Sequence, residues 1–198
     1  MILHKAALRG GLFAWRHLVA KAAGWHHARM ITRTHSRDGM FSEAVYSDCG
    51  AYRYSLSRTW DDDGPRVNFV MLNPSKADEI RNDPTVERCE QRARRLGFGA
   101  FEVTNIFAWR DTDPHAMRRA TKPVGPENDA MLLTAATRAD QVIAAWGVHG
   151  AHKDRGAAVA RLLDTAGRPL HHLGLTKDGH PRHPLYLPYA RQPQPWSR

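Results

Sequence analysis

The stretch "RVNFVMLNPSKAD", Arg66–Asp78, decides the fold, because a short apolar run ends abruptly in Asn73, Pro74 and Ser75. Such a run, with few polar residues, is typical of a central strand that is covered on both faces. A second run, "FEVTNIFAWR", also carries an asparagine near its end, Asn105. Two apolar strands are therefore expected to deliver amide side chains to their carboxyl ends.

Apolar runs alternate with amphipathic segments along the rest of the chain. A helix is predicted from Pro84, with Asp83 as its N-cap and Gly97 just past its end. This alternation predicts an α/β fold with three layers, α/β/α, around a central, mainly parallel four-stranded sheet. The four expected strands of this sheet are the apolar runs at 66–72, 101–107, 141–147 and 169–175, and further helices are expected from Pro126 and Asp154. Before them, "AYRYSLSRTW" at 51–60 alternates polar and apolar residues, which indicates a half-buried strand.

The charge of the chain is concentrated at its start. The net charge is +9 and the pI is about 10.1, which suggests a polyanionic partner, although a solvated basic surface is the alternative. Residues 1–40 carry seven basic residues against one acid and so supply +6 of this charge. We expect a basic N-terminal extension or helix at 1–40 that lies on nucleic acid, followed by a single α/β domain at 41–198.

The composition argues against several classes of protein. Two cysteines, Cys49 and Cys89, support neither a disulfide framework nor a four-cysteine metal or iron–sulfur site. The histidine pairs show no zinc-like spacing, so no metal and no cofactor are expected. No run approaches the roughly 18 apolar residues of a membrane span. The expectation is a cytoplasmic, monomeric protein.

In open parallel sheets, ligands bind outside the carboxyl ends of the strands. The residues expected there are Asn73 with its following Pro74 and Ser75, then Asn105, and then Trp146-Gly147 in "AAWG". The last loop, 176–188, adds "HPRHPL" with His183. The sequence thus predicts one polar site built from four strand ends.

This ordered set resembles the uracil-DNA glycosylase superfamily, in its mismatch-specific, thymine-DNA-glycosylase-like branch. In that branch the first strand ends in Asn-Pro, as Asn73-Pro74 does here, and a later strand ends in a base-reading asparagine, which corresponds to Asn105. A histidine-proline motif lies in the last loop, as His183-Pro184 does, with His180-Pro181 as the alternative. From about residue 40 onward the chain also resembles a bacterial family of unknown function marked by "LNPS-x-AD", "DPT", "NIFAWR-x-TDP", "VGPEND" and "HPLYL".

The resemblance implies a role for each residue. Asn73 would hold the hydrolytic water with help from Asp78, and His183 would steady the departing base. Asn105 would read the edge of the base, in a pocket completed by Pro74, Ser75 and Phe107. The residues expected to contact DNA are Lys76, Arg110, Arg182, Pro184, Leu185 and Tyr186.

The implied activity is that of a monofunctional DNA glycosylase, which flips a base from double-stranded DNA and hydrolyses its N-glycosidic bond. A neutral Asn73 in place of aspartate forfeits the stabilisation that a carboxylate gives a cationic sugar, so a slow enzyme is expected. Ser75 is small where uracil-specific members carry a bulky tyrosine. This favours a C5-modified pyrimidine, such as hydroxymethylcytosine or its glucosylated form in phage DNA, and a role in antiphage defence.

Three alternatives stay open. Asn73-Pro74 could simply end a strand and start a turn, which is the commonest use of Asn-Pro. The site could instead belong to an N-glycoside hydrolase or transferase acting on free nucleosides or nucleotides. It could also belong to a non-catalytic module that binds nucleic acid.

Overall fold

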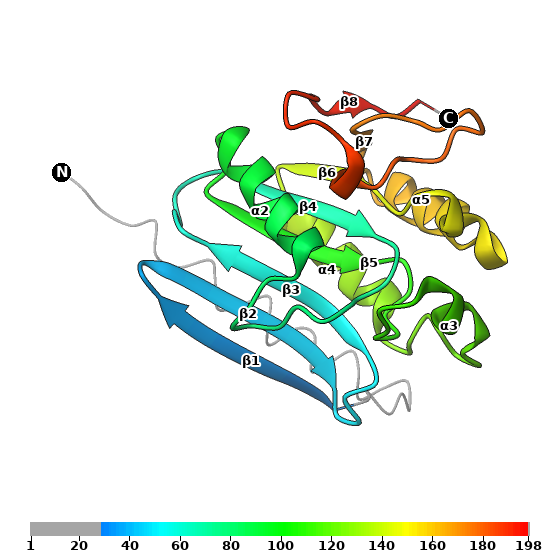
Figure 1. The fold of residues 1–198 in the computed structure, drawn as a ribbon, viewed down its shortest axis with the longest axis horizontal. Helices are drawn as coiled ribbons and strands as arrows, with labels where there is room; N and C mark the ends of the chain where they lie inside the picture. Colours follow the sequence, from blue (N-terminus) through cyan, green and yellow to red (C-terminus); the bar gives the residue numbers. More distant parts are fainter. Residues whose placement is uncertain (1–28, 198) are drawn as a thin grey trace.

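The structure is a computed structural model that describes residues 29–197, and a single eight-stranded sheet forms its centre (Figure 1). The spatial order of the strands is β1-β2-β3-β5-β4-β6-β7-β8. Their bounds are β1 Met30–Arg37, β2 Met40–Ser47, β3 Arg53–Thr59, β4 Arg66–Met71, β5 Ala100–Asn105, β6 Gln141–Ala144, β7 Leu170–His172 and β8 Gln194–Pro195. The helices are α2 Pro84–Arg95, α3 Pro114–Arg119, α4 Asn128–Arg138 and α5 Arg155–Thr165, with 3-10 helices η1 Val148–Asp154 and η2 Pro184–Tyr186.

The predicted four-stranded sheet is wrong. The sheet has eight strands and is mixed, and four of its seven strand pairings are antiparallel. Strands β4, β5, β6 and β7 pair with one another in parallel, but β1, β2 and β3 extend the sheet antiparallel beyond β5, and β8 closes the other edge. The fold is therefore not the compact parallel sheet that the resemblance implied.

The strand predicted at 51–60 is confirmed as β3, but the hairpin of β1 and β2 was not predicted, and β1 lacks the burial pattern that marks a strand in a sequence. Almost every residue of β1 is exposed, because β1 is an edge strand that pairs only with β2. The turn that joins these two strands consists of Asp38 and Gly39, both at positive φ (51° and 76°). Asp-Gly is a strong signal for a two-residue hairpin. Residues 30–37, which we assigned to the N-terminal extension, thus lie in the sheet.

Apolar side chains cover both faces of the parallel strands. Helix α2 packs on one face, where Val86 and Cys89 meet Phe69 and Phe101. Helices α4 and α5 pack on the opposite face, where Leu132 meets the side chains of β4 and β6. The carboxyl ends of the four parallel strands emerge between these layers.

The helix predicted from Pro84 is confirmed at both ends. The Asp83 side chain accepts hydrogen bonds from the backbone N–H groups of Thr85 and Val86, at 3.0 and 2.9 Å. Gly97 follows the C-cap residue with a φ of 82°, a conformation that glycine adopts without strain. Asp83 thereby fixes the end of the loop that begins at Asn73.

The basic arm proposed for residues 1–40 falls mostly outside the described residues, because Lys5, Arg9, Arg16 and Lys21 all precede residue 29. Among residues 29–197, no helix has the length and apolar character needed to cross a membrane.

Candidate functional site

A cavity of about 570 Å³ opens at the carboxyl ends of the four parallel strands. Its wall includes Asn73 after β4, Asn105 at the end of β5, and Trp146-Gly147 after β6. The loop that follows β7 contributes the last part of the wall. The lining residues from that loop are Thr176, Arg182, His183, Leu185 and Tyr186.

Asn73 is held by the loop that follows β5. Its Nδ2 donates to the backbone carbonyl of Asp111 at 2.8 Å and to that of Pro74 at 3.2 Å. Because both partners are carbonyl oxygens, they identify the nitrogen of the amide and fix its plane. The Oδ1 atom then remains to accept a hydrogen bond from a water molecule or a ligand hydroxyl group.

Asn105 is buried, at 2% exposure, and its register with β4 places it beside Met71, two residues before Asn73. Its Oδ1 is buried and finds no hydrogen-bond partner in the described part of the chain. The backbone is held firmly, because Nδ2 of Asn128 donates to the carbonyl of Asn105 at 2.9 Å and to that of Ile106 at 3.0 Å. A buried acceptor without a partner costs about 1–3 kcal/mol, so a ligand donor would relieve it.

His183 presents a neutral imidazole to the cavity. Its Nδ1 accepts the backbone N–H of Leu185 at 3.3 Å, at the start of η2. Burial lowers the pKa of His183 to about 4, an effect that the charge of Asp83 partly opposes. At neutral pH the ring proton therefore lies on Nε2, which can only donate.

The loop that carries His183 is anchored by a buried arginine of α2. Arg92 is fully buried, and its guanidinium donates to four backbone carbonyl groups of the segment 187–191. Arg88 adds a bond of 2.6 Å to the carbonyl of Leu187 and stacks its guanidinium 3.8 Å from the ring centre of Tyr189. The position of His183 thus depends on α2 through these contacts.

Trp146 forms its part of the wall because two glycines make room for its indole. A Cβ atom at Gly150 would lie 2.0 Å from Trp146 Cδ1, and one at Gly156 would lie 2.7 Å from its Nε1. The indole is 2% exposed and packs against Trp196, with ring centres 5.5 Å apart. Side chains at these two positions would push Trp146 into the cavity.

Exposed apolar and basic groups surround the mouth of the cavity. Tyr186 is 78% exposed and Val148 is 50% exposed. A shallower hollow of about 450 Å³ adjoins the cavity, sharing Ser75 with it and carrying Lys76 and Arg110. The surface around the mouth therefore combines aromatic, aliphatic and cationic side chains.

The structure gathers many of the predicted site residues, but not all of them. Asn73, Ser75, Asn105, Arg182, His183, Leu185 and Tyr186 line the cavity, and Lys76 and Arg110 line the adjoining hollow. Four other predicted residues are not part of either wall: Asp78, Pro74, Phe107 and Pro184.

Asp78 and Phe107 have structural contacts. Oδ1 of Asp78 accepts the backbone N–H groups of Ile80 and Arg81, at 2.9 and 2.7 Å. Burial raises the pKa of Asp78, but these two bonds outweigh it and the pKa is lowered overall. Phe107 is fully buried, with its ring 5.7 Å from that of His152.

Sequence reasoning missed Arg53 of β3, which also lines the cavity. Arg53 is 2% exposed, and its Nη1 donates to the carbonyl of Ala77 at 2.6 Å, beneath the loop that follows Asn73. The signal was present, because "YRYSLSR" places two arginines, Arg53 and Arg58, in a strand that is otherwise of buried character. Asp83, predicted as a helix cap, lines the cavity as well.

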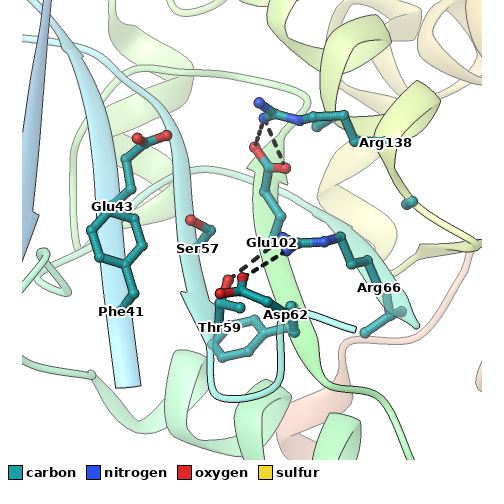
Figure 2. A pocket seen from close by; sticks show the side chains of 13 residues that line it. Phe41, Glu43, Ser57, Thr59, Asp62, Arg66, Glu102 and Arg138 are labelled. Atoms are coloured by element: carbon teal, nitrogen blue, oxygen red, sulfur yellow. Dashed lines mark hydrogen bonds and ion pairs between the residues drawn. The ribbon is translucent and has the colours of Figure 1, made fainter. Parts of the chain in front are cut away.

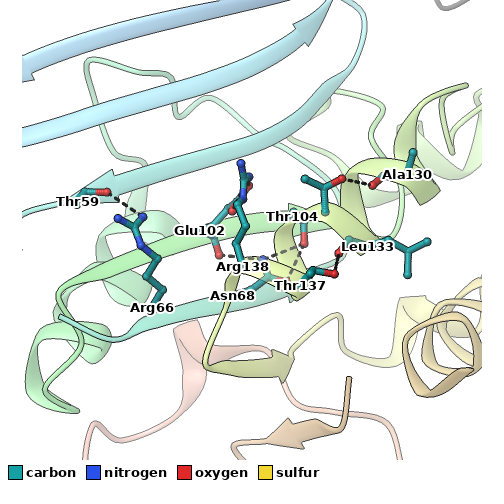
Figure 3. A network of polar contacts seen from close by, with 10 residues as sticks. Thr59, Arg66, Asn68, Glu102, Thr104, Ala130, Leu133, Thr137 and Arg138 are labelled. Atoms are coloured by element: carbon teal, nitrogen blue, oxygen red, sulfur yellow. Dashed lines mark hydrogen bonds and ion pairs between the residues drawn. The ribbon is translucent and has the colours of Figure 1, made fainter. Parts of the chain in front are cut away.

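A second cavity, of about 210 Å³, lies at the opposite ends of β4 and β5, and Figure 2 shows the contacts that its two arginines make. Arg138 binds both carboxylate oxygens of Glu102, at 2.9 and 3.0 Å, and Arg66 reaches Thr59 and Asp62. Figure 3 shows Asn68, a buried residue of the same strand as Arg66, whose Nδ2 donates to the hydroxyl of Thr104 at 3.1 Å.

A family model described as a protein of unknown function (DUF1643) matches residues 53–185. No curated protein and no solved structure matches the chain. The assignment to the uracil-DNA glycosylase superfamily is therefore corrected, since the matching family model does not describe that superfamily. The motifs behind it are short, and an asparagine at a strand end also serves to bind neighbouring backbone, as Asn73 does here.

Proposed function

Since the chain belongs to the DUF1643 family, whose description assigns no activity, we propose its function from the cavity: a DNA glycosylase for a flipped-out, C5-modified pyrimidine. The observation that carries this proposal is the buried Oδ1 of Asn105, which has no partner among the described residues. Asn105 lines a cavity whose wall also holds Asn73 and a neutral His183.

The size and chemistry of the cavity suit a nucleobase. Its volume of about 570 Å³ lies in the range of small-molecule sites, roughly 300–1,000 Å³. A pyrimidine carries N–H donors on one edge, and one of them can satisfy Oδ1 of Asn105. The apolar side chains of Val86, Val103 and Trp146 lie in the same wall and offer contact to the faces of a flat ring.

The reaction would proceed by hydrolysis of the bond between C1′ of the sugar and the base nitrogen. Breaking this bond leaves the electron pair on the base, and a water molecule held by Oδ1 of Asn73 adds to C1′ and loses a proton. Nε2–H of His183 can donate a hydrogen bond to the departing base. Because Asn73 and His183 are both neutral, we expect slow turnover.

The small side chain of Ser75 supports tolerance of a substituent on the pyrimidine ring. Ser75 lines both the cavity and the adjoining hollow, so a substituent on a bound ring could extend past Ser75 toward the hollow. Hydroxymethylcytosine and its glucosylated form, which occur in phage DNA, are substrates of this kind. Antiphage defence in the cytoplasm is the corresponding role.

The mouth of the cavity favours polymeric DNA over a free nucleoside or nucleotide. Tyr186 and Val148 are apolar and exposed, as expected for side chains that fill the space left by a flipped base. Lys76 and Arg110 can neutralise phosphate groups beside the mouth. A free nucleoside needs neither feature.

The test is to incubate the purified full chain with genomic DNAs, including phage DNAs with modified pyrimidines, and to identify the released bases by mass spectrometry. We expect release of a modified pyrimidine and formation of abasic sites. Asn73→Ala should bind DNA but release no base. Release from free nucleosides at a rate equal to that from DNA would favour the hydrolase alternative. Binding without any release would favour the non-catalytic module.

A further inference from the structure

Arg53 is a buried cation in the wall of the cavity, and the reaction proposed for Asn73, Asn105 and His183 assigns it no role. Its guanidinium is 2% exposed, and one nitrogen, Nη1, donates to the carbonyl of Ala77. Its Nε is buried without a hydrogen-bond partner within residues 29–197, a feature shared with the Nε atoms of Arg88, Arg92 and Arg168, so it is the place of Arg53 in the cavity wall that sets it apart. Burial lowers the pKa of Arg53 to about 10, so the side chain remains charged at neutral pH.

Arg53 has no carboxylate in direct contact among the described residues. Tyr46 and then Asp83 raise its pKa electrostatically without forming an ion pair, and the oxygens of Asp83 accept backbone N–H groups of Thr85, Val86 and Ala77. A buried charge without a close partner is costly, and it is tolerated where it serves a ligand.

A second buried arginine shows what a purely structural role looks like. Arg58 is 1% exposed and binds the same loop, with Nη2 donating to the carbonyl of Asp78 at 2.5 Å and to Oδ1 of Asn82 at 3.1 Å. Arg58 is not part of the cavity wall, whereas Arg53 is. The two residues therefore separate loop support from contact with a ligand.

We propose that Arg53 is a catalytic residue that stabilises the negative charge on the departing base. This inference rests on the proposed glycosylase function and deepens it. As the bond to C1′ breaks, its electron pair moves onto the base, whose anion would lie against the guanidinium. The water that adds to C1′ gives its proton to solvent, and the free base anion is protonated after it leaves the site.

Arg53 supplies a positive charge that Asn73, Asn105 and His183 lack, and it is buried, whereas Arg182, the other arginine of the wall, is exposed. Asn73, Asn105 and His183 are neutral at pH 7, so each offers only a dipole to the developing anion. A preorganised cation in a buried site acts more strongly, because little water screens it. The contribution should grow as the base becomes a poorer leaving group, because more charge then has to be stabilised by the protein.

The experiment uses the full chain and duplex oligonucleotides with one target base opposite guanine. The targets form two pairs, uracil with 5-fluorouracil and cytosine with 5-fluorocytosine, because fluorine makes each base a better leaving group. Single-turnover release is measured for the wild-type protein, Arg53→Met and the matched control Arg58→Met. Urea unfolding of each variant shows that it is folded. Arg53→Lys, which keeps the charge, replaces Arg53→Met if the latter does not fold.

We expect Arg53→Met to slow release of the non-fluorinated base by roughly 10²–10³-fold, and release of its fluorinated partner by clearly less. Arg58→Met should slow both members of a pair by one common factor. Arg53→Lys should fall between the wild type and Arg53→Met.

Equal losses for both members of a pair in Arg53→Met, or no loss at all, would overturn the inference and leave Arg53 as a support for the loop. If Arg53→Lys is tested in place of Arg53→Met, an equal slowing of release of the fluorinated and the non-fluorinated base would overturn the inference as well. Release of neither fluorinated base by the wild type would overturn it too. The proposed function is judged separately, by the panel of genomic DNAs.

Discussion

The two cavities at opposite ends of β4 and β5 treat their polar groups differently. At the amino ends, Nη2 of Arg138 donates to both carboxylate oxygens of Glu102, and further along the same strands Nδ2 of Asn68 donates to Thr104 (Figures 2 and 3). At the carboxyl ends, Oδ1 of Asn105 and Nε of Arg53 are buried without partners in the described part of the chain. Both regions are polar, but only the first satisfies these groups internally.

This difference separates stability from function. A buried polar group that finds its partner within the protein contributes to folding or is neutral, whereas one that lacks a partner costs free energy. A fold retains such a cost most readily where a ligand repays it on binding. The carboxyl-end cavity is therefore the candidate site, and the amino-end cavity is a structural feature.

Asn105→Leu should give the largest effect. Leucine has a similar shape and removes a buried acceptor that has no partner, so the free energy of unfolding should stay unchanged or rise. Base release should fall by roughly 10²–10³-fold, because the base loses the group that orients it. Single-turnover release and urea unfolding measure the two effects. A variant that releases the base normally but is less stable would show that Asn105 supports the fold and does not orient the base.

Arg138→Met should have the opposite signature. It leaves the partly buried carboxylate of Glu102 without the nitrogen that binds both of its oxygens, so we expect a loss of about 1–3 kcal/mol in the free energy of unfolding at pH 7, with base release unchanged. The exposed pair Arg161–Asp154 provides the control, since Arg161→Met should cost almost nothing.

The stability loss of Arg138→Met should also depend on pH. Burial raises the pKa of Glu102 above its unfolded value, an effect that Arg138 partly offsets. The unfolded state therefore loses its proton first, and the folded state becomes less stable as pH rises through the unfolded pKa. Lowering the pH toward 4.5 should return part of the stability that the variant lost. A loss that is the same at pH 4.5 and pH 7 would contradict this account.

The pH dependence of base release tests His183. Its pKa, about 4 in the folded protein, lies below the ordinary value of 6.5, so the imidazole stays neutral between these values. The rate of base release should therefore stay constant from pH 8 down to about 5. The stability of the protein should fall below pH 6.5, because His183 then takes up a proton in the unfolded state but not in the folded state. A rate that rises as pH falls through 6.5 would indicate a charged histidine.

Lys76→Ala should give the smallest effect. Lys76 is exposed in the hollow beside the cavity, so its loss should weaken DNA binding a few-fold and equally for all sequences. The slope of log affinity against log salt should decrease by about 1, because one phosphate contact is lost. Fluorescence anisotropy at several salt concentrations measures both quantities. An unchanged slope would remove Lys76 from the DNA-binding surface.

The sequence predicts best where local chemistry and burial agree. The run that ends at Asn73 and the helix from Pro84 are found where apolar patterning, an N-cap and a glycine place them. In the antiparallel half of the sheet, β3 lies within the strand predicted at 51–60, whereas the hairpin of β1 and β2 escaped prediction, because β1 is exposed on both faces and has no burial pattern. Arg53 escaped because its contact with Ala77 joins residues 24 positions apart, which no local pattern records.

The most direct test of the central claim compares the wild-type protein with Asn105→Leu on DNA that contains modified pyrimidines. Mass spectrometry of the released bases is the readout. The account predicts that the wild type releases a modified pyrimidine and leaves abasic sites, whereas the folded variant releases almost none. Equal release by both proteins, or no release from any DNA by the wild type, would contradict it.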